Sequence, residues 1–118
     1  MRIFVYGTLR RNQTAYHLME DANAEYLGEA ITTNDYILYN VYDFPGMIKS
    51  NSLRFDGVRG ELFEVDENNM RKIDRYECVE SNLFKRNVVE LVDGTQAIAY
   101  FYNQDTSEST LIESGIWK

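Results

Sequence analysis

The apolar residues of this chain fall into short runs of strand length, rich in β-branched and aromatic side chains and separated by turn residues. Such runs are typical of β-strands, because these side chains pack well on a pleated surface. Helical spacing of apolar residues occurs in two places, residues 14–21 and 67–77. Because these helices interrupt the strands and do not follow each one, the pattern predicts an α+β fold, with a small mixed β-barrel-like sheet and a few short helices. Strands are predicted at residues 2–6, at two places within 24–41, and at 58–65, 87–92 and 95–102.

Turn residues mark the places where these strands are expected to end. Gly7 closes the first run, Asn34-Asp35 divides the second region, and Pro45-Gly46 predicts a turn. Asp93-Gly94 separates the last two runs by residues that both tolerate positive φ angles, which predicts a type I′ hairpin. Capping candidates precede both helices: Asn12 or Thr14 for the first, and Asp66 for the second.

Composition and charge narrow the class of protein. Hydrophobic residues make up 44% of the 118 residues, enough for one packed core, so we expect a single domain over residues 1–118. The formal net charge of −7 disfavours nucleic acid and membrane surfaces, which are themselves negatively charged. One cysteine, Cys78, and one histidine provide neither a disulfide nor a zinc-ligand pattern, so we expect no metal and no cofactor. With no signal peptide in the sequence, we expect a cytoplasmic protein.

One acidic residue shares the apolar stripe of the second predicted helix. Met70, Ile73 and Glu77 are spaced i, i+3 and i+7, and so lie within about 60° of one another on the helical wheel. A carboxyl group on the buried side, at the negative end of the helix dipole, has a raised pKa and can exchange a proton near neutral pH. The basic residues of this helix fall on the other side, at Arg71, Lys72 and Arg75.

Periodicity alone leaves two alternatives to this interpretation of Glu77. The last turn of a helix often frays, and Glu77 is then a solvent-exposed end residue, which is the commoner situation for an acid. Asp74 lies close to Glu77 on the same helical wheel and competes for the same role.

The loop Gly7-Thr8-Leu9-Arg10 follows the first predicted strand directly. A glycine turn between a strand and a helix leaves backbone N–H groups unpaired, and these groups can hold a carboxylate or a developing oxyanion. Most glycines at strand ends only make turns, so the loop by itself leaves a purely structural role open.

Read together, the segments of this chain resemble the γ-glutamylcyclotransferase-like family, which includes the AIG2-like and γ-glutamylamine cyclotransferase branches. The resemblance covers essentially the whole chain, and its motifs occur in the family's order. They are Val5-Tyr6-Gly7-Thr8-Leu9-Arg10, Phe44-Pro45-Gly46-Met47, Gly60-Glu61-Leu62-Phe63-Glu64-Val65, Ile73-Asp74-Arg75-Tyr76-Glu77, Leu83-Phe84-Lys85-Arg86, residues 97–103 and Ser114-Gly115-Ile116-Trp117-Lys118. Two departures stand out, because many relatives have Glu-Gly and Tyr-Arg-Arg where this chain has Glu77-Cys78 and Phe84-Lys85-Arg86.

The resemblance implies an enzyme that releases 5-oxoproline from a γ-glutamyl amine, amide or peptide. In such a reaction the substrate's own α-amine attacks its γ-carbonyl, so the protein needs no nucleophile of its own. Glu77 is then the catalytic general acid/base, and the partner is a small-molecule γ-glutamyl substrate. The residues implied in substrate binding are Tyr6, Gly7, Thr8, Leu9, Pro45, Gly46 and Tyr100.

Two other functions remain open at this level. The departures at Cys78 and Phe84 are consistent with a catalytically silent member of the family that serves as a small-molecule binding module. A weaker alternative is an interaction protein whose tail, residues 105–118, docks a partner. The identity of the γ-glutamyl compound and the oligomeric state are not encoded in any motif of the sequence.

Overall fold

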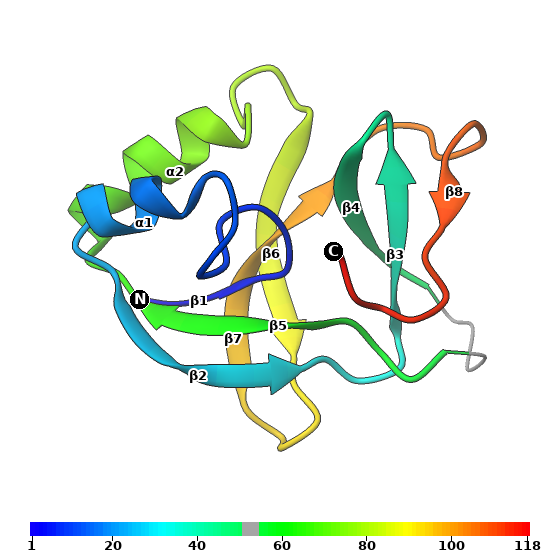
Figure 1. The fold of residues 1–118 in the computed structure, drawn as a ribbon, viewed down its shortest axis with the longest axis horizontal. Coiled ribbons are helices and arrows are strands. Elements are labelled where there is room, and N and C mark those ends of the chain that lie inside the picture. The colour runs from blue at the N-terminus through cyan, green and yellow to red at the C-terminus, as the bar shows by residue number, and fades with distance from the viewer. Residues whose placement is uncertain (51–54) are drawn as a thin grey trace.

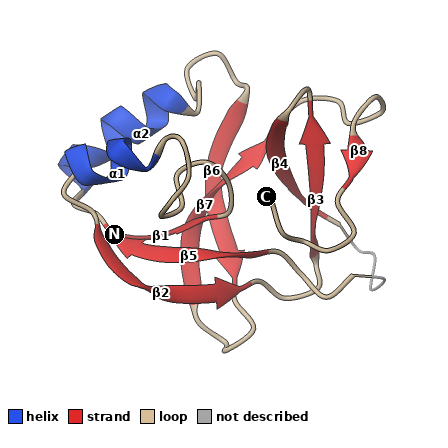
Figure 2. Ribbon diagram, viewed as in Figure 1, coloured by secondary structure: helices blue, strands red, loops and turns tan. Residues whose placement is uncertain are grey.

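The computed structural model describes residues 1–50 and 55–118, which form two β-sheets and two short α-helices (Figures 1 and 2). The larger sheet has five strands in the order β2-β5-β1-β7-β6, and the smaller has three in the order β4-β3-β8. The elements are β1 (Arg2–Val5), α1 (Tyr16–Asp21), β2 (Glu25–Ile31), β3 (Tyr36–Val41), β4 (Phe44–Lys49), β5 (Arg59–Glu64), the 3₁₀ helix η1 (Glu67–Asn69), α2 (Met70–Tyr76), β6 (Phe84–Glu90), β7 (Gln96–Tyr102) and β8 (Thr110–Leu111).

The larger sheet is mixed, as the sequence predicted. β1 runs parallel to β7 at the pair Ile3 and Ile98, whereas the other neighbouring strands are antiparallel. Beyond the ends of β2 and β6, a single antiparallel bridge joins Thr32 to Leu91. The sheet therefore curls towards itself and is barrel-like, but its described strands do not close into a continuous barrel.

The central strand β1 separates two hydrophobic cores, because successive side chains of a strand point to opposite faces. Ile3 and Val5 pack into the core beneath α1 and α2, which also contains Met19, Met70 and Ile73. Phe4 and Tyr6 face a second core that includes Tyr36, Leu38 and Met47 of the smaller sheet. The continuous apolar run of the first strand thus reflects burial on both faces. The second core binds the two sheets together.

The predicted turn at Pro45-Gly46 is wrong, since both residues lie inside β4 and pair with β3. The chain reverses at Tyr42 and Asp43, whose φ angles of 47° and 70° are those of a type I′ hairpin. β4 is an edge strand of the smaller sheet, where a proline is tolerated because one side of the strand needs no ladder hydrogen bonds.

The hairpin between β6 and β7 exists, but not with the predicted type I′ turn. Gly94 has a φ of 89°, whereas Asp93 does not adopt a positive φ. Hydrogen bonds from Gly94 N to Leu91 O (3.0 Å) and from Leu91 N to Thr95 O (2.9 Å) enclose a loop of three residues with glycine last. Three-residue hairpins commonly place glycine at this left-handed position.

Both predicted helices are present, although their capping differs from the prediction. The N-cap of α1 is Ala15, and neither Asn12 nor Thr14 occupies that position. Asp66 does occupy the N-cap of η1, but its side chain makes no capping hydrogen bond. The second helical segment therefore begins as the 3₁₀ turn η1 and continues as α2.

The C-terminal residues are part of the fold. β8 pairs with β3 through Thr110 and Leu111, and Ile112 N donates to Leu38 O at 2.8 Å. Trp117 packs against the second core. Among the described residues, no helix has the length and apolar character needed to cross a membrane.

Candidate active site

Glu77 lies at the C-terminal end of α2, and backbone hydrogen bonds cap this end of the helix. Met70 and Ile73 are fully buried and fix the helix on the sheet, and Glu77 is the C-cap residue. Val79 N donates to Asp74 O and Cys78 N to Arg75 O, each at 3.1 Å, which is the hydrogen-bond pattern of a Schellman motif. Cys78 holds the left-handed position of this motif, with a φ of 53°.

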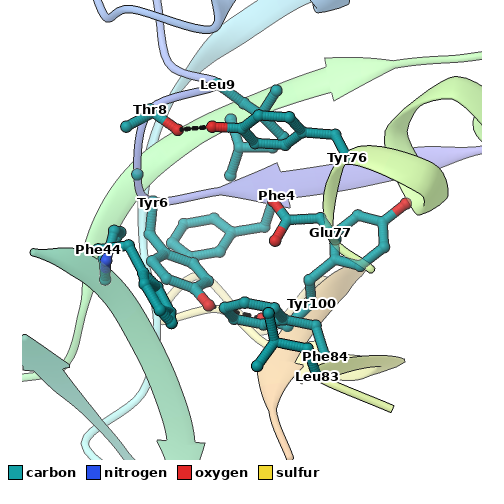
Figure 3. Close-up of a pocket in the computed structure, with 13 residues that line it drawn as sticks. Phe4, Tyr6, Thr8, Leu9, Phe44, Tyr76, Glu77, Leu83, Phe84 and Tyr100 are labelled. Atoms are coloured by element: carbon teal, nitrogen blue, oxygen red, sulfur yellow. Dashed lines mark hydrogen bonds between the residues drawn. The ribbon is translucent and has the colours of Figure 1, made fainter. Parts of the chain in front are cut away.

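Glu77 faces a cavity of about 170 Å³ between the loop after β1, the start of β4 and the end of α2 (Figure 3). The side chain is partly buried, and its carboxyl group points into the hollow and not into bulk solvent. The alternative of a frayed, exposed Glu77 therefore does not describe this structure. The lining residues are Phe4, Val5, Tyr6, Gly7, Thr8, Leu9, Phe44, Pro45, Tyr76, Glu77, Leu83, Phe84 and Tyr100.

Burial raises the pKa of Glu77 from 4.5 to about 7. The cause is the loss of water around a carboxylate that is surrounded mainly by aromatic and aliphatic side chains. At neutral pH, both the protonated and the ionised forms of Glu77 are therefore well populated. This is the condition under which one carboxyl group can act first as a base and then as an acid.

Tyr6 forms one wall of the cavity, and its hydroxyl group is already engaged by the protein. Tyr6 Oη donates to Tyr100 O at 2.6 Å and accepts a hydrogen bond from Met47 N at 3.1 Å. Burial and the neighbouring Glu77 carboxylate raise the pKa of Tyr6 far above its ordinary value. The Tyr6 ring is therefore a neutral surface for a ligand, and its hydroxyl group ties β7 to β4.

The loop after β1 is shaped by close packing against β4. A Cβ atom on Gly7 would lie 2.5 Å from Pro45 Cγ, so only glycine fits at this position. Gly7 O and Thr8 O accept hydrogen bonds from Arg10 N (3.1 Å) and Ala15 N (2.9 Å). Within the described residues, no hydrogen bond engages the N–H groups of Thr8 and Leu9. Both residues line the cavity, and their N–H groups have no acceptor in the described part of the protein.

A hydroxyl pair bridges the two sides of the cavity. Thr8 Oγ1 and Tyr76 Oη lie 2.7 Å apart, within hydrogen-bond distance, and connect the loop after β1 to the end of α2 (Figure 3). Tyr76 is 41% exposed, which places this pair at the solvent side of the cavity.

The structure brings together most of the residues that the sequence singled out. Tyr6, Gly7, Thr8, Leu9, Pro45, Glu77 and Tyr100 all line the cavity. Gly46 does not: a Cβ atom there would lie 2.9 Å from Tyr102 Cβ, so this glycine serves the packing of β4 on β7. Asp74, the competitor of Glu77, is also absent from the lining and is bound by other side chains.

Sequence reasoning missed the aromatic and aliphatic part of the cavity wall. Four of these residues lie inside motifs of the family resemblance, which indicated that they are near the site but not that their side chains point into the cavity. Phe84 packs edge-on against Tyr102 and also contacts the Phe44 ring, at centroid distances of 5.6 and 5.9 Å. The four residues are Phe44, Tyr76, Leu83 and Phe84.

Fold and cavity together define a class of protein, a small α+β chain in which one desolvated carboxylic acid faces a loop with free backbone N–H groups. The family profile described as Gamma-glutamyl cyclotransferase, AIG2-like matches residues 3–118. The chain belongs to this family.

Curated and solved relatives agree with this assignment. The Gamma-glutamylcyclotransferase family protein YtfP of Escherichia coli is 32% identical over 117 residues, which cover 99% of this chain and 96% of that protein. The solution NMR structure of Escherichia coli ytfP superimposes with a TM-score of 0.72 at 32% identity, covering 99% of this chain and 96% of the other. The crystal structure of an aig2-like protein from Mus musculus shares the fold with a TM-score of 0.82, at 24% identity over 99% of this chain and 87% of the other.

Proposed function

We propose that this protein is a γ-glutamylcyclotransferase-type enzyme that releases 5-oxoproline from a γ-glutamyl amine, amide or peptide, with Glu77 as the general acid/base. The observation that carries the proposal is the Glu77 carboxyl group, held in a hollow opposite the Gly7–Leu9 loop with a pKa of about 7. The family to which the chain belongs supports the same reaction class.

In the proposed reaction, the ionised Glu77 first removes a proton from the substrate's α-ammonium group. The freed amine attacks the γ-carbonyl carbon, which forms the new C–N bond and moves an electron pair onto the carbonyl oxygen. The N–H groups of Thr8 and Leu9 stabilise this oxyanion, and such a donor is worth on the order of 3 kcal/mol in the transition state.

The second half of the reaction returns the proton. Protonated Glu77 donates it to the departing nitrogen as the bond from the γ-carbon to that nitrogen breaks, so a neutral amine leaves. The ring nitrogen still carries two hydrogens, and the ionised Glu77 takes one of them and passes it to the released amine or to water, which leaves 5-oxoproline and an ionised Glu77. General acid/base catalysis of this kind contributes ~10²- to 10⁴-fold. The cavity walls, including the Tyr6 and Tyr100 rings, hold the flexible γ-glutamyl arm in its ring-closing shape.

We also propose that the protein acts in the cytoplasm on a freely diffusing small molecule. The net charge of −7 repels nucleic acid and anionic membrane surfaces. The cavity of about 170 Å³ has the scale of a small metabolite arm and not of a polymer.

The direct test is to incubate purified protein with a panel of γ-glutamyl compounds and to measure 5-oxoproline by mass spectrometry. We expect release by the wild type, and a loss of at least ~10²-fold in Glu77→Gln, which keeps the side-chain shape but cannot exchange protons. Glu80→Gln is the matched control, because Glu80 is a nearby exposed glutamate outside the cavity. Equal activity of wild type and Glu77→Gln would remove Glu77 from the mechanism.

A catalytically silent binding module is the second candidate, favoured by one feature of the cavity. Phe84 is buried in the wall and offers no hydroxyl group where many relatives have a tyrosine. This candidate predicts that members of the same panel raise the melting temperature without producing 5-oxoproline.

A further inference from the structure

Glu77 lies at the C-terminal end of α2, where the fewest helix hydrogen bonds hold the backbone. The helix is only seven residues long, and Glu77 caps it immediately before a cysteine in the left-handed conformation. Helix ends fray, yet an acid/base group must be held within about 0.5 Å of its productive position. The Schellman hydrogen bonds close the helix backbone here, but they are local to α2 and do not attach this end of the helix to the sheet.

Asp74 connects the last turn of α2 to two strands of the larger sheet. Its Oδ1 accepts a hydrogen bond from Tyr100 Oη on β7, at 2.6 Å, and its Oδ2 accepts one from Arg86 Nη2 on β6, at 2.5 Å. Asp74 precedes Glu77 by three residues, so the two side chains occupy neighbouring positions on the helix surface. The helix end is thus attached to the sheet one turn before Glu77.

Tyr100 takes part in both the attachment and the cavity. Its ring lines the hollow beside Glu77 (Figure 3), while its hydroxyl group is bound to Asp74. The hydrogen bond therefore holds the ring in place as the wall that keeps water from the Glu77 carboxyl group. Arg86 balances the charge of Asp74, so Glu77 does not face a second, uncompensated carboxylate.

We propose that Asp74, bound by Tyr100 and Arg86, is the positioning residue that keeps the Glu77 carboxyl group in the cavity and the Tyr100 ring against it. The kinetic part of this inference rests on the proposed function. The position of Glu77, in contrast, can be measured without turnover.

The groups around Glu77 allow its titration to be followed separately. Burial raises the pKa of Tyr6 and of Tyr100 far above neutrality, so neither ring ionises where Glu77 does. The bond to Asp74 raises the pKa of Arg86, which stays cationic throughout. The titratable and charged groups near Glu77 are Tyr6 directly after β1, Tyr100 from β7, Arg86 from β6, and Tyr76 and Asp74 from α2.

The test is an NMR titration of the side-chain carboxyl carbon of Glu77 in ¹³C-labelled protein, with Glu77→Gln used to assign the signal. We expect wild type to titrate near 7, and Asp74→Ala to titrate nearer the ordinary value of 4.5. Two effects act in this direction, because water enters beside the released Tyr100 ring and the charge of Arg86 is left unbalanced. Asp66→Ala is the matched control, since the Asp66 side chain makes no capping bond at the start of the same helical segment.

Two further variants separate geometry from charge. Tyr100→Phe keeps the ring but loses the bond to Asp74, and should lower the pKa of Glu77 by less than Asp74→Ala does. The double variant Asp74→Asn with Arg86→Gln keeps hydrogen-bonding groups at both positions without their charges, and should titrate near the wild-type value. These variants also test the positioning role of Asp74 if Asp74→Ala does not fold.

Kinetics supply the second measurement. In an active enzyme, Asp74→Ala should lower kcat by roughly tenfold to a hundredfold with little change in KM, as expected for a displaced catalytic group. A folded Asp74→Ala in which Glu77 titrates as in the wild type overturns the positioning role. Wild-type protein that releases no 5-oxoproline contradicts the proposed function alone, because the titration result does not depend on turnover.

Discussion

Glu77 has a higher pKa in the folded chain than in the unfolded one, about 7 against 4.5. Folding therefore favours the protonated form, and the stability that the neutral carboxyl group contributes is present below about pH 4.5 and lost as the pH rises through about 7. Glutamine cannot ionise and does not lose this contribution. Glu77→Gln should accordingly be more stable than wild type at pH 8, by up to roughly 3 kcal/mol, and nearly equal to it at pH 4.5.

Urea unfolding at the two pH values measures this difference. Glu80→Gln, an exposed glutamate outside the cavity, is the matched control for the change of side chain. A Glu77→Gln protein with the same stability advantage at both pH values would mean that the carboxyl group is not desolvated.

The backbone conformation of Cys78 has a measurable cost in the free energy of unfolding. It occupies the left-handed position of the Schellman motif after α2, which glycine adopts without strain and which many relatives fill with glycine. The departure noted in the sequence therefore leaves the helix terminus intact. Cys78→Gly should stabilise the protein by about 1 kcal/mol in urea unfolding.

Cys78→Ala provides the comparison for that measurement, since it removes the thiol group but keeps a Cβ atom. We expect its stability to stay close to wild type. If the alanine and glycine variants behaved alike, backbone strain at position 78 would not be the cause.

At the scale of elements, the contact between the loop after β1 and β4 sets the width of the cavity. Gly7→Ala would place a methyl group 2.5 Å from Pro45 Cγ, which forces the two segments apart. We expect a loss of about 1–3 kcal/mol in stability, the usual range for overpacking, together with reduced 5-oxoproline release. Circular dichroism melts and the mass-spectrometric assay measure the two effects.

Pairing this change with Pro45→Ala tests the cause. The double variant removes the ring carbon that the new methyl group meets. Its loss of stability should therefore be smaller than the sum of the losses in the two single variants. Strict additivity would show that Gly7 is needed for a reason other than its approach to Pro45.

The elements themselves were largely predictable, because strand and helix patterns are local. The turns were less so. Tyr42 and Asp43 reverse the chain with positive φ angles, which aspartate tolerates but tyrosine rarely adopts, whereas Pro45-Gly46, which carries the strongest turn signal, lies within an edge strand. The β3–β4 pairing is local, but the packing of Gly46 on Tyr102 also decides this region, and that contact depends on a distant part of the chain.

At the scale of the whole molecule, the candidate site is assembled from segments far apart in the sequence. Helical spacing placed Glu77 on the apolar stripe but left a solvent-exposed end residue open, and the family motifs predicted its role and most of the residues opposite it. The link from Asp74 to Tyr100 and Arg86 was not predictable, because no pattern in the sequence states which strands lie beneath the end of α2. The same holds for Phe44 and Leu83, whose direction is fixed only by tertiary packing.

β1 pairs on one side with residues 61–64 of β5 and on the other with Ile98 of β7. During synthesis, β1 therefore leaves the ribosome long before β5 or β7 has been made. Contacts so distant in sequence slow folding, because a long loop must close before they form. The Gly7–Leu9 loop follows that strand directly, and the cavity that it lines also needs Tyr100 of β7, so the candidate site takes shape only after residues as late as Tyr100 have been synthesised.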